Sequence, residues 1–178
     1  MRVAYADPPY PGCAHLYRDH ADYAGEVDHV DLLHRLCADY DGWCLNTSSP
    51  ALYKVLAAVP EDIAPEVRVM AWVKPFAAFK RNVSVAYAWE PVLVKAARKP
   101  VVKQGMTYRD FISEPITMKR GLTGAKPKAV CHWLFEVMGC EPDDDLCDLF
   151  PGTGAVTAAW DSWRNQLRIV LSSPTVAA

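Results

Sequence analysis

The stretch Val3-Ala4-Tyr5-Ala6-Asp7-Pro8-Pro9-Tyr10 decides the fold. Its first half is an apolar run of the length expected for a buried strand. Asp7-Pro8-Pro9 then ends the run abruptly, because proline fixes φ and has no backbone N–H to donate to a sheet. The stretch therefore predicts a core strand that delivers a rigid loop carrying one carboxylate and one aromatic ring.

Outward from this stretch, strand-like apolar runs alternate with segments of helical spacing. We expect further strands over residues 43–47, 66–73, 87–96, 146–150 and 167–171, and helices over residues 28–40, 49–59, 127–138 and 155–163. Asp28 is expected to cap the first of these helices, and Gly139 to end the third. This alternation predicts one α/β domain over residues 1–178, with a mostly parallel sheet that is covered on both faces.

The charge of the chain is concentrated in its middle. Residues 74–128 carry 12 basic and 3 acidic side chains, although the net charge of the whole chain is −2. Within this block, residues 98–124 are broken by prolines and glycines, which is typical of a long functional or disordered loop. A basic block inside an acidic protein indicates an enzyme that meets a polyanion through one surface, although a solvated basic face would give the same pattern.

The composition favours a folded domain away from membranes. The chain has 178 residues, 51% of them apolar, and no apolar run of the roughly 18 residues that a membrane helix needs. Met1 leads into a strand rather than a signal peptide, so we expect a soluble, cytoplasmic protein with no membrane partner. The six cysteines form no CxxC pair and are expected to be reduced and buried. Cys13, His15 and His20 match no zinc spacing, and we expect no metal.

The loop from Asp7 to Tyr10 carries the groups that an exocyclic amine needs. Such an amine is a poor nucleophile, because its lone pair is delocalised into the base ring. Two acceptors against its N–H bonds, the Asp7 carboxylate and the Pro8 carbonyl, free that lone pair. The Tyr10 ring can stack on a base extruded from its duplex. The alternative is a capped turn in which Asp7 bonds only local amides.

A second motif, Asp148-Leu149-Phe150-Pro151-Gly152-Thr153-Gly154, lies near the other end of the chain. It joins a predicted strand to a predicted helix through a glycine turn. Glycines allow a ligand close to the backbone, and the helix start offers free N–H groups and a positive dipole to a carboxylate. On its own, the turn is equally compatible with a phosphate site or a plain connection.

Together the two motifs resemble those of the circularly permuted DNA amino-methyltransferases, in which a DPPY loop precedes an FxGxG loop. The resemblance covers the whole chain and is greatest to the small phage and bacterial adenine-specific members, with a remoter likeness to DPPW-type adenine methyltransferases. Three further segments corroborate it: Trp72-Val73-Lys74-Pro75, Trp89-Glu90-Pro91-Val92-Leu93 and Gly124-Ala125-Lys126-Pro127.

The resemblance implies a Rossmann-like methyltransferase sheet in circularly permuted order and S-adenosylmethionine as the cofactor. The implied activity is methyl transfer to the exocyclic amine of a base, with adenine N6 in DNA as the first choice. The amine site would be lined by Asp7, Pro8, Pro9 and Tyr10. The cofactor would be held by Asp148, Phe150, Pro151, Gly152, Thr153 and Gly154, with Lys126 near its carboxylate. From the basic block we expect DNA phosphates to be contacted by Lys74, Lys95, Arg98, Lys99, Lys103, Lys119 and Arg120.

The chain departs from the family after the helix that follows the glycine turn. Relatives have a strand there that ends in an acid gripping the cofactor ribose, whereas here the expected strand ends Val170-Leu171-Ser172-Ser173. The chain stops soon after, which leaves open that one edge strand of the sheet is missing. These departures keep three alternatives: a degenerate nucleic-acid-binding subunit, a need for a partner subunit or homodimer, and weak cofactor binding. An RNA adenine, a cytosine N4, a protein glutamine or a small-molecule amine also remains open as the substrate.

Overall fold

The computed structural model describes residues 1–18, 25–75, 83–101, 107–117 and 125–172. Within these ranges the strands are β1 (Arg2–Ala6), β2 (Gly42–Asn46), β3 (Val67–Val73), β4 (Trp89–Lys95), β5 (Phe111–Ser113) and β6 (Asp145–Asp148). The helices are α1 (His29–Asp39), α2 (Leu52–Ala57), α3 (Lys128–Val137) and α4 (Ala155–Ser172), with 3-10 turns η1 (Ala14–Tyr17) and η2 (Ala64–Glu66).

The strands form one sheet in the order β5-β3-β4-β2-β1-β6. β1 runs parallel to both β2 and β6, and β3 runs parallel to β5. β4 runs antiparallel to its neighbours β2 and β3. The predicted α/β class is confirmed, and the reversed β4 makes the sheet mixed. The carboxyl ends of β1, β2, β3 and β6 therefore meet the start of β4 at one edge, which we call the carboxyl edge.

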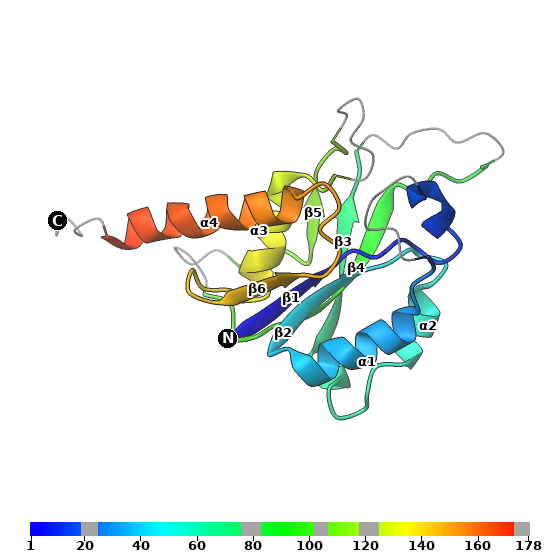
Figure 1. Cartoon of the computed structure of the whole chain (residues 1–178), viewed down its shortest axis with the longest axis horizontal. Helices are drawn as coiled ribbons and strands as arrows, with labels where there is room; N and C mark the ends of the chain where they lie inside the picture. The colour runs from blue at the N-terminus through cyan, green and yellow to red at the C-terminus, as the bar shows by residue number, and fades with distance from the viewer. Residues whose placement is uncertain (19–24, 76–82, 102–106, 118–124, 173–178) are drawn as a thin grey trace.

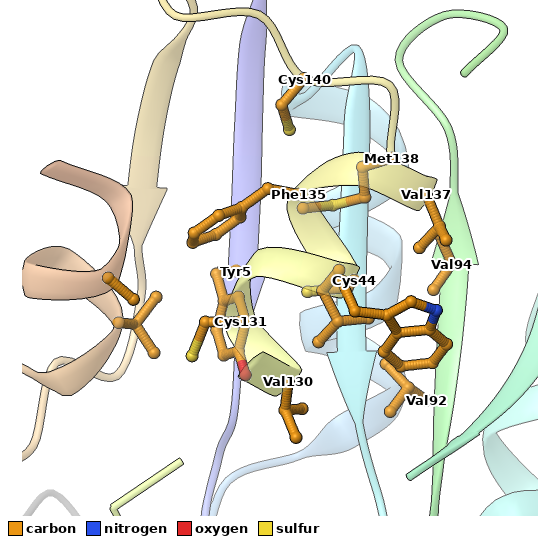
Figure 2. Close-up of a cluster of buried hydrophobic side chains, with 14 of the residues drawn as sticks. Tyr5, Cys44, Val92, Val94, Val130, Cys131, Phe135, Val137, Met138 and Cys140 are labelled. Carbon is orange, nitrogen blue, oxygen red and sulfur yellow. The ribbon is translucent and has the colours of Figure 1, made fainter. Parts of the chain in front are cut away.

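Helices cover both faces of the sheet, α1 and α2 on one side and α3 and α4 on the other (Figure 1). Successive residues of β1 divide between the two layers. Val3 and Tyr5 pack with α3 and α4, whereas Ala4 and Ala6 pack with α1 and α2. Figure 2 shows the Tyr5 ring beside Phe135 of α3, and the two ring centroids are 6.4 Å apart. A strand buried on both faces requires an apolar residue at every position, which explains the uninterrupted apolar run.

The expected caps of two helices are confirmed. Asp28 Oδ1 accepts hydrogen bonds from Val30 N at 2.8 Å and Asp31 N at 3.2 Å, which satisfies free N–H groups at the start of α1. Gly139 follows α3 with φ +69°, the left-handed conformation in which glycine commonly ends a helix.

Two expectations about secondary structure are wrong. Residues 167–171 lie within α4 rather than in a strand, because Val156, Trp160 and Trp163 continue a helical stripe along which Leu167 still packs against the core. The segment 98–124 was expected to be loop, but it contains β5, which pairs with β3 and places Ile112 against the core. The sheet therefore has six strands, as expected, but its sixth member is β5, which lies beside β3, and not residues 167–171.

The edge opposite the carboxyl edge is held together by ion pairs. Arg98 Nη1 donates to Asp144 Oδ2 at 2.6 Å and to Gly139 O at 2.7 Å, and Arg98 Nη2 donates to Asp144 Oδ1 at 2.8 Å. Burial acts against ionisation of Asp144, but the Arg98 hydrogen bonds outweigh it and hold the pKa of that carboxyl well below its usual range. Lys95 Nζ donates to Asp41 O at 2.9 Å and lies 3.4 Å from Glu66 Oε2. Arg98 and Lys95 therefore stabilise the fold at this end of the sheet.

Gly139→Ala should lower the free energy of unfolding by about 3 kcal/mol, because φ strain and a clash add together. A Cβ at Gly139 would lie 2.3 Å from Arg98 O, which is backbone and cannot move alone. Gly12→Ala is the matched control, since Gly12 has φ +77° and nothing within 4 Å of an added Cβ. It should cost about 1 kcal/mol, the φ strain alone. Urea denaturation of both variants checks this, and equal losses would contradict it.

Candidate active site

The carboxyl edge brings together residues that are far apart in the sequence. The loop after β1 starts with Asp7, and Lys74 follows the last residue of β3. Glu90 lies at the start of β4 because that strand is reversed, and it pairs in register with Trp72. Lys126 comes just before α3. Glu90 projects from the sheet face covered by α3 and α4, the face that also buries Val92 and Val94, and Lys126 reaches it from the segment before α3.

Four charged side chains meet there in an alternating row. Lys126 Nζ lies 3.2 Å from Asp7 Oδ1 and donates a 2.8 Å hydrogen bond to Glu90 Oε2. Lys74 Nζ donates to the other oxygen, Glu90 Oε1. The side chains of Lys126 and Glu90 are only 6% and 14% exposed. Two carboxylates and two ammonium groups thus compensate one another away from bulk water, as buried charges must.

The indole of Trp72 lies against both ammonium groups. Its ring centroid is 4.8 Å from Lys74 Nζ and 4.9 Å from Lys126 Nζ. The negative face of an indole attracts cations, most of all where water is excluded. Trp72 Nε1 donates a 2.7 Å hydrogen bond to Glu114 O, which fixes the orientation of the ring. The Trp72 ring therefore helps to position the ammonium groups of Lys74 and Lys126.

The cluster shifts the pKa values of its members. Burial raises the pKa of Asp7 above its ordinary value, and the charge of Lys126 limits that rise. Burial acts the same way on Glu90, but Lys126 and Lys74 outweigh it and lower the pKa of Glu90 to about 2. Burial alone would lower the pKa of Lys126, yet its anionic neighbours, Asp7 first, raise it well above the usual value. Asp7 is therefore the member of the row closest to taking up a proton.

Tyr10 lies against the same cluster. Burial raises the pKa of its phenol well above the ordinary value, and the carboxylate of Asp7 and a hydrogen bond with Glu90 raise it further. Pro8 is buried and Pro9 is partly buried. The structure thus brings all four residues of the first motif to the carboxyl edge.

The second motif lies beside the first because β6 pairs with β1. Leu149 N donates a 3.0 Å hydrogen bond to Tyr5 O, which continues the ladder beyond the end of β6. Asp148 Oδ1 accepts from Phe150 N at 3.3 Å, and Asp148 Oδ2 accepts from Thr157 Oγ1 at 3.4 Å. These two bonds tie the end of β6 to the glycine turn and to the first turns of α4. Burial raises the pKa of Asp148.

A cleft of about 440 Å³ lies between the starts of α3 and α4, with Lys126, Thr153 and Ala155 in its lining. The turn beside it is open. Gly152 has φ +46°, and the nearest atom to an added Cβ would be Phe150 O at 3.8 Å. Pro151, Gly152 and Thr153 are exposed, whereas Phe150 packs against the core on the α1 face. The cleft therefore meets bare backbone and the N-terminal end of an 18-residue helix, α4, which favours an anionic group.

The structure does not gather the basic residues expected at DNA phosphates. Lys74 belongs to the buried row, and Lys95 and Arg98 are engaged at the opposite edge. Lys99 follows Arg98 there and is exposed. The other three expected contacts, Lys103, Lys119 and Arg120, lie outside the described residues. Lys74, Lys95 and Arg98 each have a carboxylate partner within the protein, so a contact with phosphate would have to compete with these ion pairs.

Sequence reasoning left the partner of Glu90 unassigned. A glutamate on an interior strand signals a buried cation nearby, but the direction of β4 decides which lysines it meets. Lys126 was expected at the cofactor carboxylate. It does line the cleft, but its ammonium group is also bound to Asp7 and Glu90.

No helix in the described ranges combines the length and the apolar character that a membrane crossing needs. Among the same residues, no three or more side chains of His, Cys, Asp and Glu are grouped so that they could hold a metal ion. His20 lies outside the description. All six cysteines are unpaired, and Cys44, Cys131 and Cys140 are buried.

Profiles of known protein families give no match to this sequence, and curated proteins give none either. Among solved structures, the crystal structure of the M1.HpyAVI–SAM complex resembles this chain with a TM-score of 0.65 and 16% identity, over 92% of this chain and 78% of that one. A second crystal structure, of M1.HpyAVI, gives a TM-score of 0.56 and 17% identity, over 92% and 77% of the two chains. The chain therefore has the Rossmann-like methyltransferase fold that its motifs predict.

Glu90→Gln should remove up to about 3 kcal/mol of stability at pH 7, which corresponds to the fall of the Glu90 pKa from 4.5 to about 2. A depressed pKa stabilises the fold above the unfolded-state value and loses this effect as pH falls through the folded-state value. The difference between variant and wild type should thus shrink between pH 4.5 and pH 2. Glu66→Gln is the control, since Glu66 also pairs with a lysine but is 60% exposed, and it should change stability little. Urea unfolding across this pH range checks both.

Proposed function

We propose that this protein transfers a methyl group from S-adenosylmethionine to the exocyclic amine of a nucleic-acid base, with adenine N6 in DNA as the target. The observation that carries the proposal is the meeting of the two motifs across the β1–β6 pairing. One supplies acceptors for an amine, and the other a cleft at a helix start. Ligands of open α/β sheets bind at this edge, where connections leave on opposite faces. The order of the motifs along the chain supports the circularly permuted class.

The cleft fits S-adenosylmethionine. Its volume of about 440 Å³ lies within the range of roughly 300–1,000 Å³ typical of small-molecule sites. The open backbone at Gly152 and the start of α4 suit the carboxylate of the methionine end. Thr153 and Lys126 line this cleft, and the adjoining residues of the second motif that would complete the cofactor site are Asp148, Phe150, Pro151, Gly152 and Gly154. The solved M1.HpyAVI–SAM complex, which shares the fold, supports this choice. When bound, the cofactor would supply an electrophilic methyl group.

The first motif would act on the amine. The carboxylate of Asp7 accepts one N–H and the carbonyl of Pro8 accepts the other, which draws the lone pair out of the base ring. Burial strengthens these hydrogen bonds, since less water competes for them. Tyr10 holds the base by stacking, and the binding of base and cofactor at adjacent sites supplies much of the acceleration.

Lys126 keeps Asp7 in the form that accepts hydrogen bonds. Burial raises the pKa of Asp7, and a protonated carboxyl would donate where the amine also donates. The ammonium group 3.2 Å away favours the ionised form. Lys126 would thus serve the amine site as well as the wall of the cofactor cleft.

The choice of polymer rests on the basic block of residues 74–128 and on the resemblance, and RNA adenine and cytosine N4 present the same kind of amine. A degenerate binding subunit is the second candidate, favoured by the absence of the expected ribose-binding strand, since residues 167–171 are helical. Calorimetry with S-adenosylmethionine, followed by transfer of tritiated methyl groups to DNA, RNA and protein, separates these functions. Cofactor binding without transfer to any polymer would favour the second candidate.

Asp7→Ala should reduce methyl transfer by at least about a hundredfold, because one of the two amine acceptors is lost. Cofactor affinity should stay within a few-fold, since Asp7 lies in the loop after β1 and not in the glycine turn before α4 that would hold the cofactor. Single-turnover transfer and calorimetry on the same preparation measure both effects. Near-normal turnover would remove Asp7 from the mechanism.

Gly152→Val should abolish binding of S-adenosylmethionine. The added side chain would extend into the space that the ligand needs, and it meets no protein atom closer than 3.8 Å at Cβ. Gly12→Val carries a comparable strain from positive φ but lies in the loop between β1 and α1 and not in the glycine turn before α4, so it should leave cofactor affinity intact. Calorimetry compares the two, with circular dichroism to verify folding. Normal affinity in folded Gly152→Val would place the cofactor elsewhere.

Replacing Lys119 and Arg120 with Ser should make the plot of log affinity for DNA against log salt shallower by about 2, if both contact phosphates. Lys54→Ser with Arg68→Ser removes the same charge from two exposed residues outside the basic block of residues 74–128 and should leave the slope unchanged. Fluorescence titrations at several salt concentrations measure both slopes. A slope that falls equally in the two double variants would mean that net charge, not a located surface, governs binding.

A further inference from the structure

The loop that carries Tyr10 is held by the segment just before and at the start of α1. Glu26 Oε2 accepts a 3.2 Å hydrogen bond from Gly12 N, and Glu26 Oε1 accepts one of 3.3 Å from Ala14 N. On the other side of Tyr10, His29 Nε2 lies 3.1 Å from the carbonyl oxygen of Pro9. Asp28, between these two residues, caps α1, whereas Glu26 and His29 bind the loop.

Two consecutive prolines leave this loop short of its own donors. Neither Pro8 nor Pro9 has an N–H, so the partly buried Pro9 carbonyl must find its partner elsewhere. Because a carbonyl oxygen only accepts, His29 Nε2 carries the proton and donates it. His29 is 5% exposed, and its Nδ1 has no hydrogen-bond partner among the described residues. The bond to Pro9 is thus what orients the imidazole, and the imidazole in turn fixes the loop.

This bond sets the starting direction of Tyr10. The peptide between Pro9 and Tyr10 is planar, so fixing the Pro9 oxygen fixes the plane that leads into the Tyr10 backbone. On the far side, Cys13 N donates a 2.8 Å hydrogen bond to Tyr10 O and closes a turn. The anchor itself is rigid, because α1 is bound to the core through Leu32, Leu33 and Leu36.

We infer that His29 is a positioning residue for the aromatic ring that holds the substrate base. It touches neither base nor cofactor but fixes the Pro9–Tyr10 peptide, and Glu26 fixes the turn that follows. The inference rests on the proposed function of the site, because it assigns to Tyr10 the stacking role. It adds that the precision of this stacking is set by the start of α1, a segment outside both motifs.

A pair of substitutions isolates the hydrogen bond. The amide nitrogen of Gln can occupy nearly the place of His Nε2, whereas that of Asn matches Nδ1 and cannot reach the Pro9 oxygen. His29→Asn should lower kcat about tenfold, the typical effect of one lost hydrogen bond, with an unchanged Kd for S-adenosylmethionine. His29→Gln should stay within about threefold of wild type. Equal losses in both variants, or wild-type kcat in His29→Asn, would overturn the inference.

A second readout does not depend on methyl transfer. Protein labelled with 3-fluorotyrosine gives a ¹⁹F resonance for Tyr10 that Tyr10→Phe identifies among the 8 tyrosines. His29→Asn should shift or broaden this resonance, and His29→Gln should restore it. If His29→Asn does not fold, Glu26→Ala releases the exposed side of the same loop and should produce the same change. An undisturbed resonance in a folded variant contradicts the inference. If the wild-type protein transferred no methyl group to any substrate, the proposed function would be wrong. The ¹⁹F resonance of Tyr10 alone would then decide whether His29 positions this ring.

Discussion

A buried ammonium group needs anionic or hydrogen-bonding partners, and at Lys126 this requirement organises the whole carboxyl edge. Its partners come from the loop after β1 and from the start of β4, so one side chain joins the first strand, a central strand and the entry to α3. Without it, the Asp7 and Glu90 carboxylates would repel each other where little water can screen them. The Trp72 ring contacts the ammonium groups of both Lys74 and Lys126 and so helps to position these charges. The position of Asp7 in the proposed amine site thus depends on the charges of Lys126 and Glu90 beside it.

The two edges of the sheet use their charges differently. At one edge Arg98 and Lys95 bind carboxylates and backbone carbonyls, and these contacts tie strands to neighbouring helices and turns. At the other edge the row from Lys74 to Asp7 carries no net formal charge, and the glycine turn exposes its backbone next to a cleft. A basic block in the sequence is therefore not by itself a basic surface. Several of its cations serve the fold, and fewer are left to meet a polyanion.

The sequence predicts most of the architecture, because its local signals agree with the final packing. The apolar run before Asp7, the cap at Asp28 and the glycine turn each specify a backbone shape that the structure confirms. The run at residues 167–171 fails because its branched side chains favour a strand locally, whereas packing against the core prolongs α4. Contacts such as that of His29 with Pro9 depend on which elements become neighbours in space. No local pattern specifies them, although a loop with two prolines signals that an outside donor is needed.

The pairing of β1 with β6 joins residues at opposite ends of the chain, as the register of Arg2 with Asp145 shows. Closing contacts of such long range costs loop entropy, which slows folding. During synthesis, the residues around Asp7 leave the ribosome long before the strand that completes their surroundings. Until then the backbone N–H and C=O groups on the side of β1 that pairs with β6 have no strand partner. Unpaired strands of this kind can associate with other chains. The order of the two motifs along the polypeptide thus fixes when the site can first exist and leaves the nascent chain with an interval in which it is vulnerable.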